Sequence, residues 1–136
     1  MSYDLAVFDP VAAPRERSAF SVWFRAQTQW KEGHKYDDPK VSTPALREWF
    51  LSMIVEFPAL NGPYARRGLP DESAITDYTV GSVLIYAGFR WSNTQKVYKA
   101  VLRLAEEKGV GFFDVSGGEL VWWPGADGKL VAAFAI

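Results

Sequence analysis

The most constraining feature of this sequence is an apolar stripe between Pro44 and Pro58 that repeats with the period of an α-helix. Thr43 and Pro44 are typical of an N-cap and a first helical position, and Pro58 ends the pattern because proline cannot continue a helix. The stripe consists of Leu46, Trp49, Phe50, Met53, Ile54 and Phe57. A helix with such a face needs a second layer of structure to cover it, so the chain is expected to fold in layers.

Two other segments show the helical period. A first helix of roughly four turns is predicted from Pro14 to near Gly33, since proline suits a helix start and glycine a helix end. A later helix is predicted from a capping-box pattern at Ser92 and Gln95 to an end at Gly109. Their apolar positions are Phe20, Trp23, Phe24 and Trp30 in the first helix, and Val97, Val101, Leu104 and Ala105 in the later one. All three helices are expected to face one core.

Strand patterns surround these helices. Residues 2–7 alternate in polarity until Asp9 and Pro10, and residues 80–89 are rich in β-branched and aromatic side chains, which predicts one strand in each segment. The second of these strands would place Val83, Ile85, Ala87 and Phe89 on one face and Leu84, Tyr86 and Gly88 on the other. A last strand is predicted over residues 130–136, after a turn at Asp127 and Gly128.

Residues 112–116 and 119–123 flank Gly117 and Gly118 and form the strongest hairpin pattern in the chain. With a two-residue turn, Phe113 would oppose Trp122 and Phe112 would oppose Trp123. One face of the hairpin would then be apolar, with Phe113, Val115, Leu120 and Trp122, and would meet the helices. The outer face would carry Phe112, Asp114, Ser116, Glu119, Val121 and Trp123.

This order of elements predicts an α+β open sandwich, with about three helices packed on one face of a mainly antiparallel sheet of four to six strands. A length of 136 residues indicates a single domain over residues 1–136. Residues 59–76 have no periodicity and many breakers and charges, which predicts a long surface loop of functional or mobile character.

Composition excludes several classes of function. The chain has 15 Lys and Arg against 16 Asp and Glu, a net charge of −1, so neither nucleic acid nor a membrane is expected as a partner. It has no cysteine, which excludes disulfides and thiolate chemistry and fits a reducing compartment. The sequence shows no signal-peptide pattern and no apolar run of about 18 residues, which predicts a cytoplasmic protein.

Catalytic patterns are weak throughout the sequence. The single histidine, His34, lies near Tyr36, Asp37 and Asp38, a set that could bind a metal or share a proton. A solvated loop closed by Pro39 explains the same residues and is the favoured interpretation. A serine nucleophile would need a base and a Gly-x-Ser-x-Gly turn, and that turn is absent. The expectation is a protein that is not an enzyme, with no catalytic residue, metal or cofactor.

The six tryptophans divide by position. Trp23, Trp30 and Trp49 belong to helical stripes, and Trp91 is expected to pack at a strand-to-helix junction. Trp122 and Trp123 are consecutive in a strand and must point to opposite faces. The predicted register leaves Trp123 outside, either covered locally or as an anchor of a binding patch. If it is an anchor, the substitution Trp123→Ala would weaken partner binding and leave thermal stability nearly unchanged.

The sequence therefore nominates a partner-binding surface rich in aromatic and acidic groups, which would select a basic partner. On the hairpin the candidates are Phe112, Asp114, Glu119 and Trp123, with Tyr86 added if its strand adjoins the hairpin. Tyr36, Asp37 and Asp38 are the candidates in the loop.

Residues 1–10, 77–92 and 109–116 resemble a family of small bacterial cytoplasmic proteins, and proteins with this opening look like immunity proteins of polymorphic or contact-dependent toxin systems. The resemblance spans nearly the whole chain and implies a cognate toxin as partner, neutralised by steric and electrostatic occlusion. It carries over no binding residue. Two alternatives are a small-ligand or enzymatic domain with the 59–76 loop as a lid, and a homodimer built on the aromatic patch.

Overall fold

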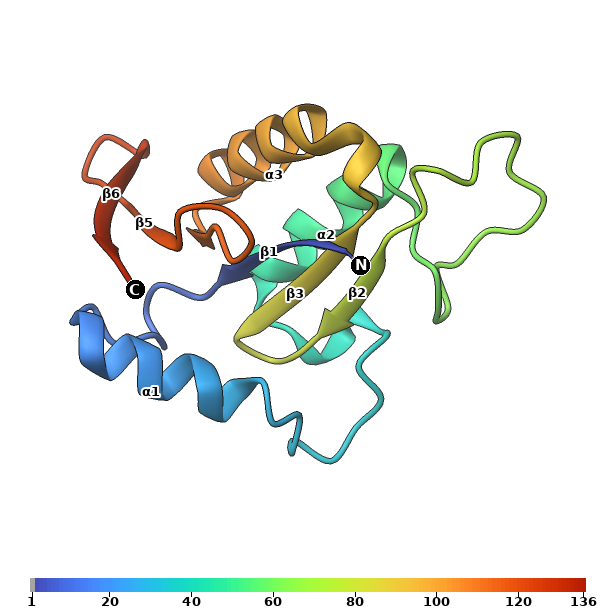
Figure 1. Ribbon diagram of the computed structural model, residues 1–136. Helices are drawn as coiled ribbons and strands as arrows, with labels where there is room; N and C mark the ends of the chain where they lie inside the picture. Colours follow the sequence, from blue (N-terminus) through green and yellow to red (C-terminus); the bar gives the residue numbers. More distant parts are fainter. Residues whose placement is uncertain (1) are drawn as a thin grey trace.

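An antiparallel sheet with helices on both of its faces organises the chain (Figure 1). The computed structural model describes residues 2–136, and over this range it contains three α-helices and six strands. The helices are α1 Arg17–Gln27, α2 Pro44–Glu56 and α3 Thr94–Lys108. The strands are β1 Tyr3–Phe8, β2 Asp77–Val80, β3 Leu84–Phe89, β4 Gly111–Phe113, β5 Leu120–Pro124 and β6 Leu130–Ala135. The strand order is β2-β3-β1-β4-β5-β6, which confirms the predicted α+β open sandwich.

The helices are distributed differently from the expectation that all of them share one face. α2 and α3 cover one face, where Leu5 and Val7 of β1 are buried. α1 covers part of the other face, where Phe8 of β1 packs with Phe20. The physical reason is that β1 is apolar in both directions, because Ala6 and Phe8 follow the opposite parity from Leu5 and Val7.

α2 has the predicted bounds and supplies the centre of the core. Trp49 is fully buried, and its indole N–H donates to the carbonyl of Val101 in α3 at 3.4 Å. α3 ends at Gly109, where a φ of +75° requires glycine, as the sequence indicated. Its predicted capping box does not form, because Ser92 lies in a short 3₁₀ helix, Trp91–Asn93, and Asn93 takes the N-cap position.

α1 is shorter than predicted at both ends. Its N-cap is Glu16, whose carboxylate accepts hydrogen bonds from the backbone N–H groups of Ser18 and Ala19. The predicted start at Pro14 is therefore wrong. The helix ends at Gln27, so Trp30 lies beyond it in a left-handed conformation with a φ of +55°.

The single strand predicted over residues 80–89 is two strands in the structure. β2 and β3 pair in antiparallel register, and the chain turns between them with Gly81 N–H donating to the Leu84 carbonyl at 2.8 Å. The predicted division of faces holds for β3. Ile85, Ala87 and Phe89 pack toward α2 and α3, whereas Leu84 and Tyr86 lie on the α1 side.

The hairpin of β4 and β5 has a register one residue away from the predicted one. Phe112 pairs with Trp122, because the connection is a six-residue loop, 114–119, and not a two-residue turn. Asp114 shapes this loop, since its carboxylate accepts the N–H of Gly117 at 3.0 Å. A register shift of one residue moves every side chain of a strand to the opposite face of the sheet relative to its partner strand. Trp123 is consequently buried beneath α1, and Phe112 is buried on the opposite side against α3.

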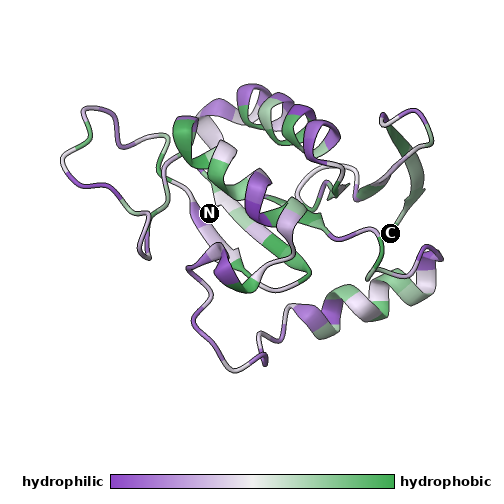
Figure 2. Cartoon of the chain, turned by 180° about the vertical axis from the view of Figure 1, so that it is seen from behind, coloured by the Kyte–Doolittle hydropathy of each residue, from purple (hydrophilic) through white to green (hydrophobic). Residues whose placement is uncertain are grey.

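The last hairpin and the long loop agree with the sequence. Gly128 has a φ of +82° in the turn before β6, and β6 pairs with β5 along an apolar edge of the sheet, shown green in Figure 2. Residues 59–76 contain no helix or strand and project from the sheet (Figures 1 and 2). Among residues 2–136, no helix combines the length and the apolar character needed to cross a membrane.

Because Trp123 is buried, its removal is expected to destabilise the protein, whereas the sequence led to the expectation of nearly unchanged thermal stability. Its ring lies 4.9 Å from that of Phe8 and 6.0 Å from that of Phe20, so Trp123→Ala is expected to lower the free energy of unfolding by about 3–5 kcal/mol. Denaturant unfolding measures this loss. The matched control is Trp91→Ala, because Trp91 is 48% exposed and its removal is expected to cost about 1 kcal/mol. Equal losses in the two variants would contradict the assignment.

Candidate functional site

A groove opens on the α1 side of the sheet, over Gly88 in the middle one of the three adjacent strands β2, β3 and β1. Gly88 of β3 pairs with Asp4 of β1 on one side and with Asp77 of β2 on the other. Residues directly opposed in antiparallel strands point to the same face, so two carboxylates flank a position that has no side chain. The register of the three strands thus creates a hollow with an acidic group on each side.

Tyr86 and Asp4 form the floor of this groove. The Tyr86 hydroxyl donates to Asp4 Oδ2 at 2.6 Å, and the Ser2 hydroxyl donates to Asp4 Oδ1 at 2.5 Å. Partial burial, followed by the hydrogen bond to Asp4 and its negative charge, raises the pKa of Tyr86 well above the usual value for tyrosine. Tyr86 therefore remains a hydrogen-bond donor and holds the Asp4 carboxylate in a fixed orientation.

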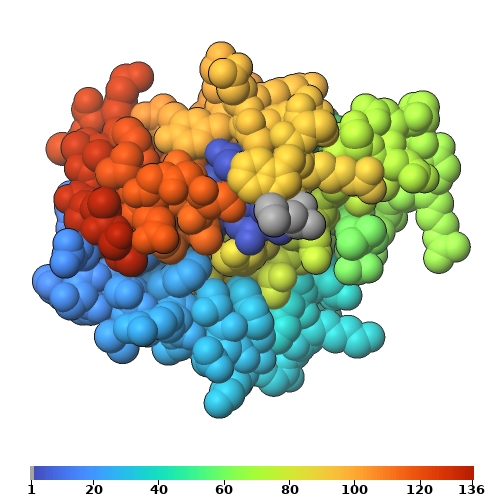
Figure 3. Space-filling model, viewed as in Figure 1, coloured from blue at the N-terminus to red at the C-terminus, as the bar shows by residue number. Residues whose placement is uncertain are grey.

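The end of α1 and the residues after it form the wall of the groove. Phe24, Thr28 and Trp30 line it from this side, and Val115 of the 114–119 loop lines it opposite. The volume is about 430 Å³. Figure 3 shows the yellow-green surface of β2 and β3 between the blue of α1 and the orange of the 114–119 loop. We call this hollow the acidic groove; it is lined by Ser2, Asp4, Phe24, Thr28, Trp30, Asp77, Thr79, Tyr86, Gly88 and Val115.

Trp30 has a strained backbone. A φ of +55° is uncommon for a bulky residue and costs on the order of 1–2 kcal/mol. The indole is held by an edge contact with the ring of Tyr36, with ring centres 5.3 Å apart. Strain of this kind persists only where the surroundings enforce it, and it is concentrated at functional sites.

The electrostatic character of the acidic groove is negative. Among the described residues that line it, Asp4 and Asp77 are the ionisable acids and none is basic. Thr28, the C-cap of α1, also lines it, and the carbonyl groups at a helix C-terminus carry partial negative charge. The groove is therefore suited to a cationic group bounded by aromatic surfaces.

The segment after Trp30 is fastened to the turn between β2 and β3 by Glu32. Its carboxylate accepts hydrogen bonds from the N–H of Ser82 at 3.0 Å and from the Ser82 hydroxyl at 2.9 Å. The His34 ring contacts the same carboxylate at 2.6 Å, and its other nitrogen lies 2.9 Å from the Lys35 carbonyl. This network fixes the chain that carries Tyr36, and through it the position of Trp30.

The His34 and Glu32 side chains favour each other's charged forms. The hydrogen bond to the Lys35 carbonyl, and next the one to Glu32, raise the pKa of His34 above its usual value. Burial opposes the charge on Glu32, but hydrogen bonds from His34 and Ser82 outweigh it and hold the pKa of Glu32 below its usual value. Over residues 2–136, no group of three His, Cys, Asp or Glu side chains is arranged to hold a metal ion.

The residues nominated from the sequence do not form one surface. Phe112 and Trp123 are buried on opposite faces, and Asp114 is only 8% exposed. The expected outer face with these three residues around Glu119 is therefore wrong, because the register differs by one residue. Glu119 is exposed in the 114–119 loop, with a φ of +56°.

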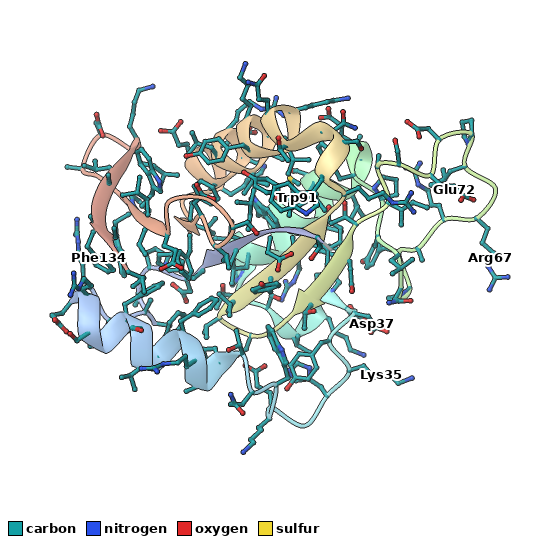
Figure 4. All side chains as sticks on the ribbon, in the orientation of Figure 1. Lys35, Asp37, Arg67, Glu72, Trp91 and Phe134 are labelled. Carbon is teal, nitrogen blue, oxygen red and sulfur yellow. The ribbon has the colours of Figure 1, made fainter. Side chains whose placement is uncertain are left out.

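Of the remaining nominated residues, two belong to the acidic groove or its wall, and Asp37 and Asp38 do not line it. Tyr86 lines it, and Tyr36 supports the Trp30 wall. Asp38 caps a short 3₁₀ helix, Pro39–Val41, by accepting the N–H of Lys40. Asp37 approaches Gly62 of the long loop so closely that a side chain there would collide with it. In Figure 4, Lys35 points away from the sheet on this same segment.

Sequence reasoning missed Asp4, Asp77 and the wall residues Phe24 and Trp30. The alternation of residues 2–7 places Asp4 on the face opposite Leu5, and this was the available indication. The missing information was that β1 and β2 flank β3, which brings both carboxylates beside Gly88.

Comparison of the chain with protein-family models, with curated proteins and with solved structures gave no match. The geometry of the acidic groove and its surroundings is therefore the basis on which a function can be proposed.

The contact between His34 and Glu32 predicts a pH-dependent stability. A raised pKa in the folded state stabilises the protein when His34 is protonated, and this contribution is lost as pH rises through the folded pKa. The free energy of unfolding of the wild type relative to His34→Gln is expected to decrease as pH rises from about 6.5, the ordinary pKa of histidine, into the alkaline range. Denaturant unfolding across this range measures it. A difference that stays constant or grows with pH would contradict the assigned contact.

Proposed function

We propose that the protein is a non-catalytic protein-binding domain that neutralises a cognate bacterial toxin by steric and electrostatic occlusion, as immunity proteins do. The observation that supports this proposal is the acidic groove, where Asp4 and Asp77 flank Gly88 and no described lining residue is basic. Toxins that act on nucleic acid or other polyanions carry basic residues at their active sites, and a negative, rigid surface is complementary to them.

An exposed aromatic side chain lies at the same end of β1, against the other face of the sheet. Trp91 is 48% exposed and packs against Tyr3, with ring centres 5.3 Å apart, next to the Ser2 and Asp4 end of β1. Figure 4 shows it near the N-terminal end of that strand. Partly exposed tryptophans held by a neighbouring ring are frequent anchors of protein interfaces. Trp91 therefore offers apolar contact at the end of β1 where the acidic groove offers charge recognition, but from the opposite face.

Rigidity favours inhibition by occlusion. The groove floor is made of three paired strands, and Asp4 is held by Tyr86 and Ser2. The wall at Trp30 is fixed by Tyr36 and by the hydrogen bonds of Glu32 to Ser82. A surface that is ordered before binding loses little conformational entropy when a partner docks.

A small-ligand or enzymatic domain is the second candidate function. The volume of about 430 Å³ falls within the roughly 300–1,000 Å³ that is usual for small-molecule sites. This function was expected to use the 59–76 loop as a lid over the binding site. None of the residues that line the groove comes from this loop, so the loop does not cover it. The homodimer remains a third proposal, which the solution mass decides.

The test of the proposed function starts from the adjacent upstream gene, which is expected to encode a large protein with a variable C-terminal toxin domain, and continues with coexpression of that domain. The protein is expected to relieve the growth arrest caused by that domain and to form a stable complex with it, measured by light scattering after gel filtration. Unrelieved growth arrest together with separate elution of the two chains would overturn the proposal.

Charge variants locate the contact surface. Asp77→Lys is expected to weaken the complex at least about tenfold, because it places a positive charge opposite a basic partner. The matched control is Glu72→Lys, since Glu72 lies at the far end of the 59–76 loop (Figure 4). Calorimetric titration measures both variants. Equal weakening by the two substitutions would show a long-range charge effect and not a contact at the groove.

A further inference from the structure

We propose that the acidic groove is a receptor for a guanidinium group, so that an arginine side chain of the partner inserts between Trp30 and the Asp4–Tyr86 pair. The inference rests on the proposed function for the statement that a protein carries this group. Its chemistry, however, depends on the groove alone and can be tested with a small guanidinium compound.

The charge of the groove selects a cation. Asp4 and Asp77 stand on either side of Gly88 in one row of the sheet, and the C-terminal end of α1 adds partial negative charge at Thr28. Asp77 is exposed, and its carboxylate accepts no hydrogen bond from the part of the chain that the structure describes. The row therefore holds more acceptors than the protein itself uses.

The Asp4 carboxylate is prepared for a planar donor. Each of its oxygens already accepts one neutral hydroxyl, from Ser2 at Oδ1 and from Tyr86 at Oδ2. A carboxylate oxygen has two lone pairs, so one acceptor site remains on each atom. Two parallel N–H groups of a guanidinium match two such sites, whereas an ammonium group is a point charge without this geometry.

The aromatic walls favour a flat cation as well. Trp30, Phe24 and Tyr86 line the groove, and the rings of Phe24 and Tyr86 are 6.4 Å apart. Guanidinium is planar and weakly hydrated and stacks on aromatic faces, which lowers the cost of removing it from water. The chain already uses this interaction elsewhere, because the guanidinium of Arg15 lies 5.6 Å from the centre of the Trp123 ring.

The space for the ligand is created by the missing side chain at position 88. A Cβ built at Gly88 would lie 3.4 Å from Asp4 Oδ1 and 3.5 Å from the Ser2 hydroxyl, which are ordinary contact distances. A Cβ can therefore be placed there without a close contact, and a larger side chain built on it would occupy part of the groove. Gly88→Val suits this purpose, because valine also favours strand conformation.

The experiment titrates the full chain with N-acetyl-arginine amide and follows the indole N–H signals by nuclear magnetic resonance, with Trp30 assigned from Trp30→Phe. The expected result is a saturable shift of the Trp30 signal with a dissociation constant in the millimolar range, as a single side chain provides. The matched probes are N-acetyl-lysine amide and N-acetyl-citrulline amide. Lysine is expected to bind at least about fivefold more weakly, and the neutral citrulline compound is expected to produce no saturable shift.

Variants connect the shift to the groove. Asp77→Asn is expected to weaken binding about threefold to tenfold, and Gly88→Val is expected to abolish the saturable shift. Glu72→Gln serves as the charge-matched control and is expected to bind like the wild type. Unfolding curves that match the wild type exclude loss of structure as the cause of either effect.

Each outcome decides one statement. Equal shifts with the arginine and citrulline compounds, or unchanged binding in Gly88→Val, would overturn the inference. Equal affinity for arginine and lysine would overturn the choice of guanidinium. A micromolar dissociation constant for the arginine compound alone would support the guanidinium site but count against the proposed function, because a free small ligand would then suffice. Millimolar binding of the arginine compound together with failure of the toxin test would likewise support the guanidinium site and count against the proposed function.

Discussion

The structure depends on the burial of Phe8 on the face of the sheet opposite to α2 and α3. Its ring lies 5.1 Å from that of Phe20 and 4.9 Å from that of Trp123, and it is completely shielded from solvent. The ring is so closely surrounded that a Cβ at Gly111 would overlap with it. Because β1 is central in the sheet and apolar in both directions, one layer of helices cannot bury it, and α1 must lie across the second face.

The acidic groove is a consequence of how far α1 reaches. The helix covers Phe8 and its neighbours on the β4 and β5 side, and it ends at Gln27 before it reaches the row of Asp4, Gly88 and Asp77. The chain then turns sharply at Trp30 and runs beside β2, where Val80 N–H donates to the Tyr36 carbonyl at 2.9 Å. The part of the sheet that α1 leaves open is therefore bounded by aromatic groups and remains acidic.

Individual elements of the fold differ in how far the sequence could predict them. α2 was predictable because a run of bulky apolar residues at helical spacing, bounded by prolines, has one stable arrangement. The hairpin register was not, because Asp114 and the left-handed Glu119 extend the connection to six residues and shift every pair by one position. The acidic groove was not predictable either, because Asp4 and Asp77 are distant in sequence and are brought to either side of Gly88 only by the pairing of β1 and β2 with β3.

The sequence by itself determined the α+β class, the bounds of α2, and the placement of Trp122 and Trp123 on opposite faces of one strand. These are local properties, since they follow from the period of side chains along one segment. Only the tertiary structure decided which faces are buried and which carboxylates are neighbours. Those properties depend on strand order and register, and a loop residue or a helix end that changes either one moves side chains between the core and the surface.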